Sequence, residues 1–400
     1  MSLNLLKRLK SGLIYKGYLK VKKCIIACFR CFPICAEKVV FDNFGGRGYG
    51  DDPKYIAEYL RQSGKKFRLI WVTQDVNTPL PEGIRPVKYG TIRAAYHWAT
   101  ARVWVDNIKS SFKVKKKRGQ YYIQTWHSTL GFKKNEGQVS NLPGEYVERA
   151  KKDAAVTDLM YSNNDIRKMI YETYYWYSGP VLKCGVPRNT VLFHVTEELR
   201  ERVYTYFGVE KNKKLLLYAP TFRKSGRLDM YCMEYEQVIK AAEDRWGGEF
   251  VLLLRLHPND AKQSNFITYS DKVLNASEYP DMQELLAISE VLITDYSGCM
   301  FDFSFMKKPV FLYVPDLKEY LEKERELQFS FDEVPFQKAG VFSELLQCIK
   351  DFAPEAYGQD CEAFFRKIGL CEDGNGAKVI GDIIIQKCFG DGEKGCVNCL

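Results

Sequence analysis

Two of the four histidines in this chain follow apolar runs that are typical of buried strands. His127 follows residues 121–126, and His257 follows residues 251–256. In open α/β sheets, ligands bind in the crevice at the carboxyl ends of the strands. Histidine suits that position because its ordinary pKa of about 6.5 lets it accept a hydroxyl proton near neutral pH. We interpret His127 and His257 as candidate catalytic residues, with a purely structural role as the alternative for each.

A Ser-Gly turn after the apolar run 291–294 has the chemistry of a phosphate-binding site. Ser297 offers a hydroxyl group, and Gly298 lets the backbone come close to a ligand. The helix expected to follow would present free amide hydrogens at its start, which suit a diphosphate. We expect Asp295 to cap that helix, because a carboxylate repels phosphate. Asp302, one turn later, could reach a ribose or stay in solvent, and a plain capping turn is the alternative for the whole motif.

A third group of polar residues follows the apolar run 215–219. Arg223 can bind a phosphate group with two hydrogen bonds, and Thr221 can donate one more. For Arg223 taken alone, a position in a surface loop is the competing interpretation. The candidate donor-binding residues are therefore Thr221, Arg223, Arg255, Thr294, Ser297, Gly298 and Asp302.

Apolar runs alternate with helix-like stretches along most of the chain. This alternation predicts βαβ units and mostly parallel sheets, an α/β fold. The first unit begins with a strand at 39–44 and a glycine-rich turn at 45–50, after which Asp51 and Asp52 are expected to cap a helix. A length of 400 residues suggests two domains. We place them at 39–190 and 191–400, the second with the C-terminal helices.

Residues 1–38 form a basic arm that carries eight of the nine net positive charges, because it holds nine Lys and Arg against one Glu. The excess charge is thus local, and we expect no nucleic-acid partner. Arg30 interrupts the most apolar stretch, which is too short for the roughly 20 apolar residues of a membrane span. A basic amphipathic segment on an anionic membrane surface fits the arm better, and an ordinary surface helix is the alternative.

The spacing of the cysteines in the arm is similar to that of a metal-binding motif. Cys24, Cys28 and Cys31 have the C-x3-C-x2-C spacing of radical-SAM iron–sulfur proteins, and Cys35 follows. These offsets place all four on one helical face with no strand before them, so we expect an apolar stripe rather than a cluster. Thirteen cysteines without a secretory signal favour a reducing cytoplasm. The sequence implies no cofactor and no metal pair, and Mg²⁺ accompanying a diphosphate stays open.

Taken together, these segments resemble the CDP-glycerol:poly(glycerophosphate) glycerophosphotransferase family, the teichoic-acid polymerases and primases and their capsule relatives. The motifs occur in the family's order over about residues 39–320. Residues 124–129 resemble its W-H-G-T block, residues 218–223 its Y-A-P-T-[WF]-R block, residues 255–258 its R-x-H-P block, and residues 293–316 its T-D-Y-S-S…F-D…K-P…Y-x-P-D run.

The resemblance implies a GT-B-like fold, with two Rossmann-type domains facing a central cleft. It also implies a peripheral protein on the cytoplasmic face of the bacterial cell membrane. The implied donor is CDP-glycerol or a related CDP-polyol such as CDP-ribitol. The implied acceptor is a lipid-linked cell-wall or capsule polymer, and CMP is released. His127 matches the family's proposed base, and His257 matches its second essential histidine.

Five residues at four sites depart from the family pattern, although both histidines are retained. Ser128 replaces a glycine, residues 130–131 replace Pro-Leu, Thr190 replaces an aspartate, and Gly298 replaces the second serine. These departures bear on the choice of donor and acceptor. One alternative is a GT-B glycosyltransferase that uses a nucleotide sugar, which rests on analogy of fold. The other, suggested by Ser128 and Gly298, is a non-catalytic assembly factor docked on the membrane.

Overall fold

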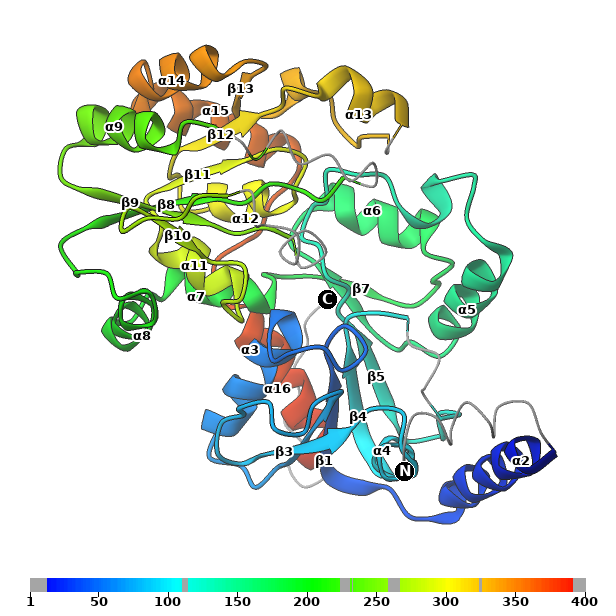
Figure 1. Cartoon of the computed structure of the whole chain (residues 1–400). Helices are drawn as coiled ribbons and strands as arrows, with labels where there is room; N and C mark the ends of the chain where they lie inside the picture. The colour runs from blue at the N-terminus through cyan, green and yellow to red at the C-terminus, as the bar shows by residue number, and fades with distance from the viewer. Residues whose placement is uncertain are drawn as a thin grey trace.

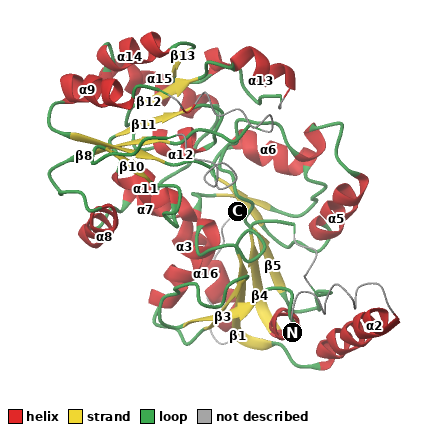
Figure 2. Ribbon diagram, viewed as in Figure 1, coloured by secondary structure: helices red, strands yellow, loops and turns green. Residues whose placement is uncertain are grey.

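Two parallel β-sheets, one in each lobe, form the framework of the molecule (Figure 1). The computed structural model describes residues 13–109, 114–223, 231, 233–257, 267–323 and 326–390. Helices pack on both sides of each sheet (Figure 2). Because both faces are covered, the central strands of the second lobe are apolar along nearly their whole length, as parallel strands usually are.

The sheet of the first lobe has the strand order β3-β2-β1-β4-β5. Alternate residues of β1 face opposite layers, so Val39 and Phe41 pack under α3 and α16 while Val40 packs with Trp98 of α4. A bridge from Ile123 to Leu159 continues this sheet toward the pair β6-β7. The elements are β1 (Cys35–Asp42), α3 (Asp51–Gln62), β2 (Arg68–Thr73), β3 (Ile84–Lys88), α4 (Ile92–Thr100), β4 (Ala101–Asp106), β5 (Tyr121–Gln124), α5 (Gly144–Ala154), β6 (Met160–Ser162), α6 (Asp165–Tyr174) and β7 (Val181–Lys183).

The sheet of the second lobe has the order β10-β9-β8-β11-β12-β13, which is the Rossmann order 3-2-1-4-5-6. The expected pair of Rossmann-type domains facing a cleft is therefore confirmed. The elements are η3 (Pro187–Asn189), α7 (Thr190–Phe193), α8 (Glu197–Phe207), β8 (Lys214–Tyr218), α9 (Tyr235–Trp246), β9 (Phe250–Leu254), β10 (Val273–Asn275), α11 (Met282–Ile288), β11 (Val291–Thr294), α12 (Cys299–Ser304), β12 (Val310–Tyr313), α13 (Leu317–Lys323), β13 (Gln337–Ala339), α14 (Phe342–Lys350), α15 (Pro354–Lys367) and α16 (Gly376–Phe389).

The last helix, α16, returns to the first lobe (Figure 1). Ile380 and Ile384 are buried in the same apolar cluster as Val39 and Phe41 of β1. The expected division after residue 190 stays a prediction, but it assigns α16 to the second domain, whereas this helix packs on the sheet of the first. The chain therefore crosses twice between the lobes.

The arm begins, within the described residues, with α2 (Leu13–Cys28), which lies beside α4. The rings of Phe29 and Phe32 pack edge-on against Tyr96 at 5.6 and 5.8 Å. Cys24, Cys28 and Cys31 are exposed, and the described residues contain no group of three metal-binding side chains. In the described part of the chain, the helices are all too short or too polar to cross a membrane. Residues 1–12 of the arm lie outside the described residues.

Candidate active site

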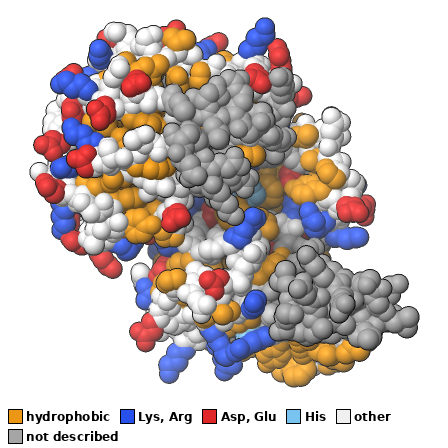
Figure 3. All heavy atoms as spheres, in the orientation of Figure 1, with side chains coloured by type: hydrophobic (Ala, Val, Ile, Leu, Met, Phe, Trp, Pro, Cys, Tyr) orange, Lys and Arg blue, Asp and Glu red, His pale blue; other side chains and the backbone are white. Residues whose placement is uncertain are grey.

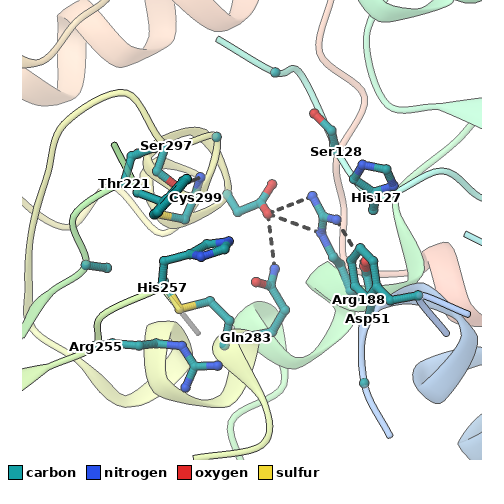
Figure 4. Close-up of a pocket in the computed structure, with 18 of the residues that line it drawn as sticks. Asp51, His127, Ser128, Arg188, Thr221, Arg255, His257, Gln283, Ser297 and Cys299 are labelled. Carbon is teal, nitrogen blue, oxygen red and sulfur yellow. Dashed lines mark hydrogen bonds and ion pairs between the residues drawn. The ribbon is translucent and has the colours of Figure 1, made fainter. Parts of the chain in front are cut away.

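A cavity of about 710 Å³ between the lobes is lined by both candidate histidines. His127 follows β5 of the first lobe, and His257 follows β9 of the second. A histidine side chain is visible in the hollow between the lobes in Figure 3, and Figure 4 shows the two rings on opposite sides of the pocket. Other predicted residues on the cavity wall are Thr221, Arg255, Ser297, Gly298 and Asp302.

His127 is held as a neutral base with one nitrogen free. Its Nδ1 lies 2.8 Å from the main-chain oxygen of Asn107. Since a carbonyl oxygen only accepts hydrogen bonds, this contact assigns the proton to Nδ1 and leaves a lone pair on Nε2. The Trp126 ring stacks on the imidazole at 4.2 Å, and the Phe44 ring lies 5.3 Å away. Burial among these groups lowers the pKa of His127, which favours the neutral form at pH 7.

Asn107 joins His127 to the glycine-rich turn that follows β1. Its side-chain oxygen accepts a hydrogen bond from the Phe44 amide at 2.7 Å. Its amide group donates to Asn43 at 2.7 Å and to Asp51 at 3.1 Å. The buried Asn107 thus fixes the turn and the start of α3 through its side chain, and the ring of His127 through its main-chain oxygen.

The turn itself needs glycine. Phe44, Gly45, Gly46 and Gly48 all have positive φ values, between 48° and 81°. At Gly46 a Cβ atom would lie only 2.9 Å from the Gln74 amide nitrogen, closer than real Cβ atoms come. The turn therefore packs on the end of β2 in a way that only glycine permits, and Phe44 of the same turn lies 5.3 Å from the His127 ring.

Arg188, in η3 between the lobes, connects the two sides of the cavity. It donates to Asp51 of the first lobe at 3.0 Å and pairs with Asp302 of the second lobe, also at 3.0 Å (Figure 4). It also donates to the Thr129 hydroxyl at 2.8 Å, and its main-chain amide donates to Asp52 at 2.8 Å. Asp51 and Asp52 were expected only to cap α3, but their carboxylates bind this arginine.

The structure corrects two of the predicted donor-binding residues. The Arg223 side chain is only 2% exposed and pairs with Asp295 at 2.8 Å and with Asp316 at 2.7 Å. Thr294 is buried, and its hydroxyl donates to the Ala219 carbonyl at 2.7 Å. Neither residue lines the cavity. Their contacts hold the loops after β8 and β11 in place instead of reaching a ligand.

Asp295 also differs from expectation, because it caps no helix. Its two oxygens accept hydrogen bonds from the Thr221 amide at 2.9 and 3.0 Å. The residue that precedes α12 is Gly298, which has no side-chain cap. Asp295 therefore positions the Thr221 loop beside the cavity.

Two polar atoms at the donor side lack an internal partner within the described residues. The hydroxyl of Thr221 and one carboxylate oxygen of Asp302 are buried without a hydrogen bond. Buried polar groups are nearly always paired, so atoms of this kind on a cavity wall are suited to a ligand. Nearby, Gly298 faces Gly131 of the other lobe, and a Cβ at Gly298 would lie 3.9 Å from the Gly131 Cα atom.

Two of the residues that depart from the family pattern, Ser128 and Gly131, contact the same side chain. The Ser128 hydroxyl accepts a hydrogen bond from Arg167 at 3.0 Å. Gly131 has a φ of 75°, and a Cβ there would overlap the same guanidinium group. The buried Arg167 thus occupies the space beside both positions. We infer that Ser128 and Gly131 together make the space and the hydrogen bond that the Arg167 side chain requires.

Comparisons with known proteins show which chains this one is similar to. The family model described as CDP-Glycerol:Poly(glycerophosphate) glycerophosphotransferase matches residues 25–386. A teichoic acid poly(glycerol phosphate) polymerase from Staphylococcus epidermidis is 29% identical over 87% of this chain, which spans 50% of that protein. A protein of the same name from Bacillus spizizenii is 26% identical over 86% of this chain and 90% of its own length.

Solved structures extend the similarity to the fold. The wall teichoic acid polymerase TagF superimposes with a TM-score of 0.82 and 26% identity, over 98% of this chain and 99% of the solved one. A TagF variant soaked with CDPG gives a TM-score of 0.83 and 25% identity, over 98% and 100% of the two chains.

The unpartnered hydroxyl of Thr221 leads to a stability prediction. Thr221→Val should change the free energy of unfolding by less than about 0.5 kcal/mol, because this hydroxyl makes no hydrogen bond to the described residues that could be lost. Thr294→Val in the same lobe is the matched control. It removes the bond to Ala219 and should cost about 1–3 kcal/mol. Urea unfolding of both variants measures the difference, and equal losses would show that the Thr221 hydroxyl is bonded within the protein.

Proposed function

Because this chain belongs to the CDP-glycerol:poly(glycerophosphate) glycerophosphotransferase family, whose model matches residues 25–386, we propose that it is a polyol-phosphate transferase. It moves glycerol phosphate, or a related polyol phosphate, from a CDP-linked donor to a hydroxyl group of a cell-wall or capsule polymer. The observation that carries this proposal is that His127 and His257, from opposite lobes, line one cavity together with polar residues that have an atom without a partner among the described residues. The names of the relatives point to the same chemistry.

The reaction assigned to the cavity is a displacement at phosphorus. The terminal hydroxyl oxygen of the acceptor attacks the β-phosphorus of the CDP-polyol and forms the new phosphodiester bond. The bond from that phosphorus to the bridging oxygen breaks, and CMP leaves. The free Nε2 of His127 accepts the hydroxyl proton, which its neutral form permits.

The second lobe supplies the donor side of this reaction. His257 is exposed at the end of β9, and its ring lies 5.5 Å from that of Phe222. His257, the Thr221 hydroxyl and the Ser297–Gly298 turn hold the diphosphate and stabilise charge on the leaving CMP. The unpartnered oxygen of Asp302 accepts a hydrogen bond from a ribose hydroxyl. These roles use donors already placed around the cavity, so little reorganisation is required.

The arm is assigned to a membrane surface, where it keeps the cavity beside a lipid-linked acceptor. Eight of the nine net positive charges lie in residues 1–38. The side chains of Val21, Ile25 and Phe32 are 58%, 37% and 47% exposed, so apolar groups accompany the charge. Such a segment binds anionic lipid through electrostatic attraction and through burial of its apolar side chains in the membrane surface. We propose a peripheral position on the cytoplasmic face of the bacterial membrane.

The proposed base is tested by turnover. The purified protein should release CMP from CDP-glycerol when given a lipid-linked glycerol-phosphate primer, and His127→Ala should slow release by about 100-fold or more. His194→Ala is the matched control, since His194 is exposed and lies outside the cavity wall, and it should leave the rate unchanged. Undiminished turnover in His127→Ala would refute the assignment. Turnover with UDP-hexoses alone would favour the alternative of a glycosyltransferase. Failure to bind CDP-polyols would favour the alternative of a non-catalytic assembly factor.

The proposed membrane contact is tested by vesicle sedimentation. The protein should bind vesicles with about 30% anionic lipid, and each basic residue near the surface contributes about 1 kcal/mol. The double variant Lys20→Glu and Lys23→Glu should therefore bind much more weakly. Lys240→Glu with Lys272→Glu makes the same charge change in the second lobe and should bind normally. Equal binding by both double variants would contradict a role for the arm.

A further inference from the structure

We propose that Asp51 is a positioning residue for His127, whose carboxylate stabilises the imidazolium that forms when this base accepts a proton. We further propose that Arg188 limits this effect from its place between the lobes. The catalytic consequence rests on the function proposed above, while the electrostatic coupling can be measured without it.

The backbone at Asp51 is held in an uncommon conformation. Asp51 is the first residue of α3 and has a φ of 55°, in the left-handed region that residues with a Cβ atom seldom adopt. Aspartate and asparagine tolerate this region best among them. Strained positions of this kind cluster at functional sites. Asp51 lines the same cavity as His127, with its side chain 10% exposed.

The contacts of Asp51 tie it to the base. One carboxylate oxygen accepts from Arg188 at 3.0 Å, and the other accepts from the Asn107 side chain at 3.1 Å. The main-chain oxygen of Asn107 in turn holds Nδ1 of His127 at 2.8 Å. The carboxylate and the imidazole are therefore fixed to the same residue, so their relative position is set before any ligand arrives.

Charges on several elements act on the imidazole. Burial is the main cause of its lowered pKa; the hydrogen bond to the Asn107 main chain and then the Asp51 carboxylate raise the pKa, whereas Arg188 and Arg167 of α6 lower it. Lys109 lies 5.5 Å from the Trp126 ring that stacks on His127, and its charge is paired with Glu136 at 2.6 Å.

Asp51 is thus the carboxylate that opposes the cations around His127. In the resting protein Arg188 partly neutralises it, which keeps the base uncharged. When the proton moves to Nε2, the carboxylate compensates the new positive charge. Arg188 also pairs with Asp302, so the group that adjusts the base is anchored on the donor lobe.

The test compares charge changes of opposite sign around His127. Asp51→Asn keeps the shape of the side chain, and asparagine tolerates the left-handed backbone conformation at this position. It should lower the pKa of His127, read from the NMR titration of its ring protons, by about 1 pH unit. The acidic limb of the pH–rate profile for CMP release should move to lower pH. The kcat should fall about tenfold or more, while KM for CDP-glycerol changes little. Arg188→Gln should move the pKa and the limb in the opposite direction.

Glu58→Gln is the matched control, because it removes one negative charge from the same helix away from the cavity. It should move neither the titration nor the limb. An unchanged or raised pKa of His127 in folded Asp51→Asn would overturn the inference. If Arg188→Gln does not fold, the direction seen in Asp51→Asn decides alone. If the unmodified protein releases no CMP, the proposed function fails, and the NMR titration still decides the role of Asp51.

Discussion

The structure depends on one buried guanidinium group that both lobes must neutralise. Arg188 pairs with Asp51 on one side and Asp302 on the other, each at 3.0 Å. A buried cation without such partners costs several kcal/mol, so the two lobes are favoured in the arrangement that supplies both carboxylates. Lys54 of α3 adds a second cross-lobe pair, 2.6 Å from Asp281. These pairs join the two lobes beside the cavity that both histidines line.

The two sides of the cavity are prepared in different ways. On the first lobe, the Asn107 side chain binds the glycine-rich turn, and the Asn107 main-chain oxygen holds Nδ1 of His127. On the second lobe, the Thr221 hydroxyl and an Asp302 oxygen are left without internal partners among the described residues. The base on the first lobe is therefore held in place, while polar groups on the second lobe are available to bind the donor. This arrangement is expected of a transferase.

The sequence predicts most of this framework and only part of the site. The strands and the positions of His127 and His257 follow from local apolar runs and their ends, which need no knowledge of distant residues. Arg223 is a suitable phosphate ligand by residue type, yet Asp295 and Asp316 bind it, and nothing local reveals that they lie opposite. The role of Arg188 was missed because its partner Asp51 is 137 positions away. In the sequence, only the departure from the family pattern at Thr190 draws attention to that segment.

A crystal structure of the protein with CDP-glycerol tests the central claim most directly. We expect the diphosphate to lie in the cavity within hydrogen-bond distance of His257 and Thr221, with the glycerol-bearing phosphorus turned toward Nε2 of His127 and Arg188 still bridging the lobes. A nucleotide bound outside this cavity, or a complex in which protein atoms separate His127 from the phosphate, would contradict the account.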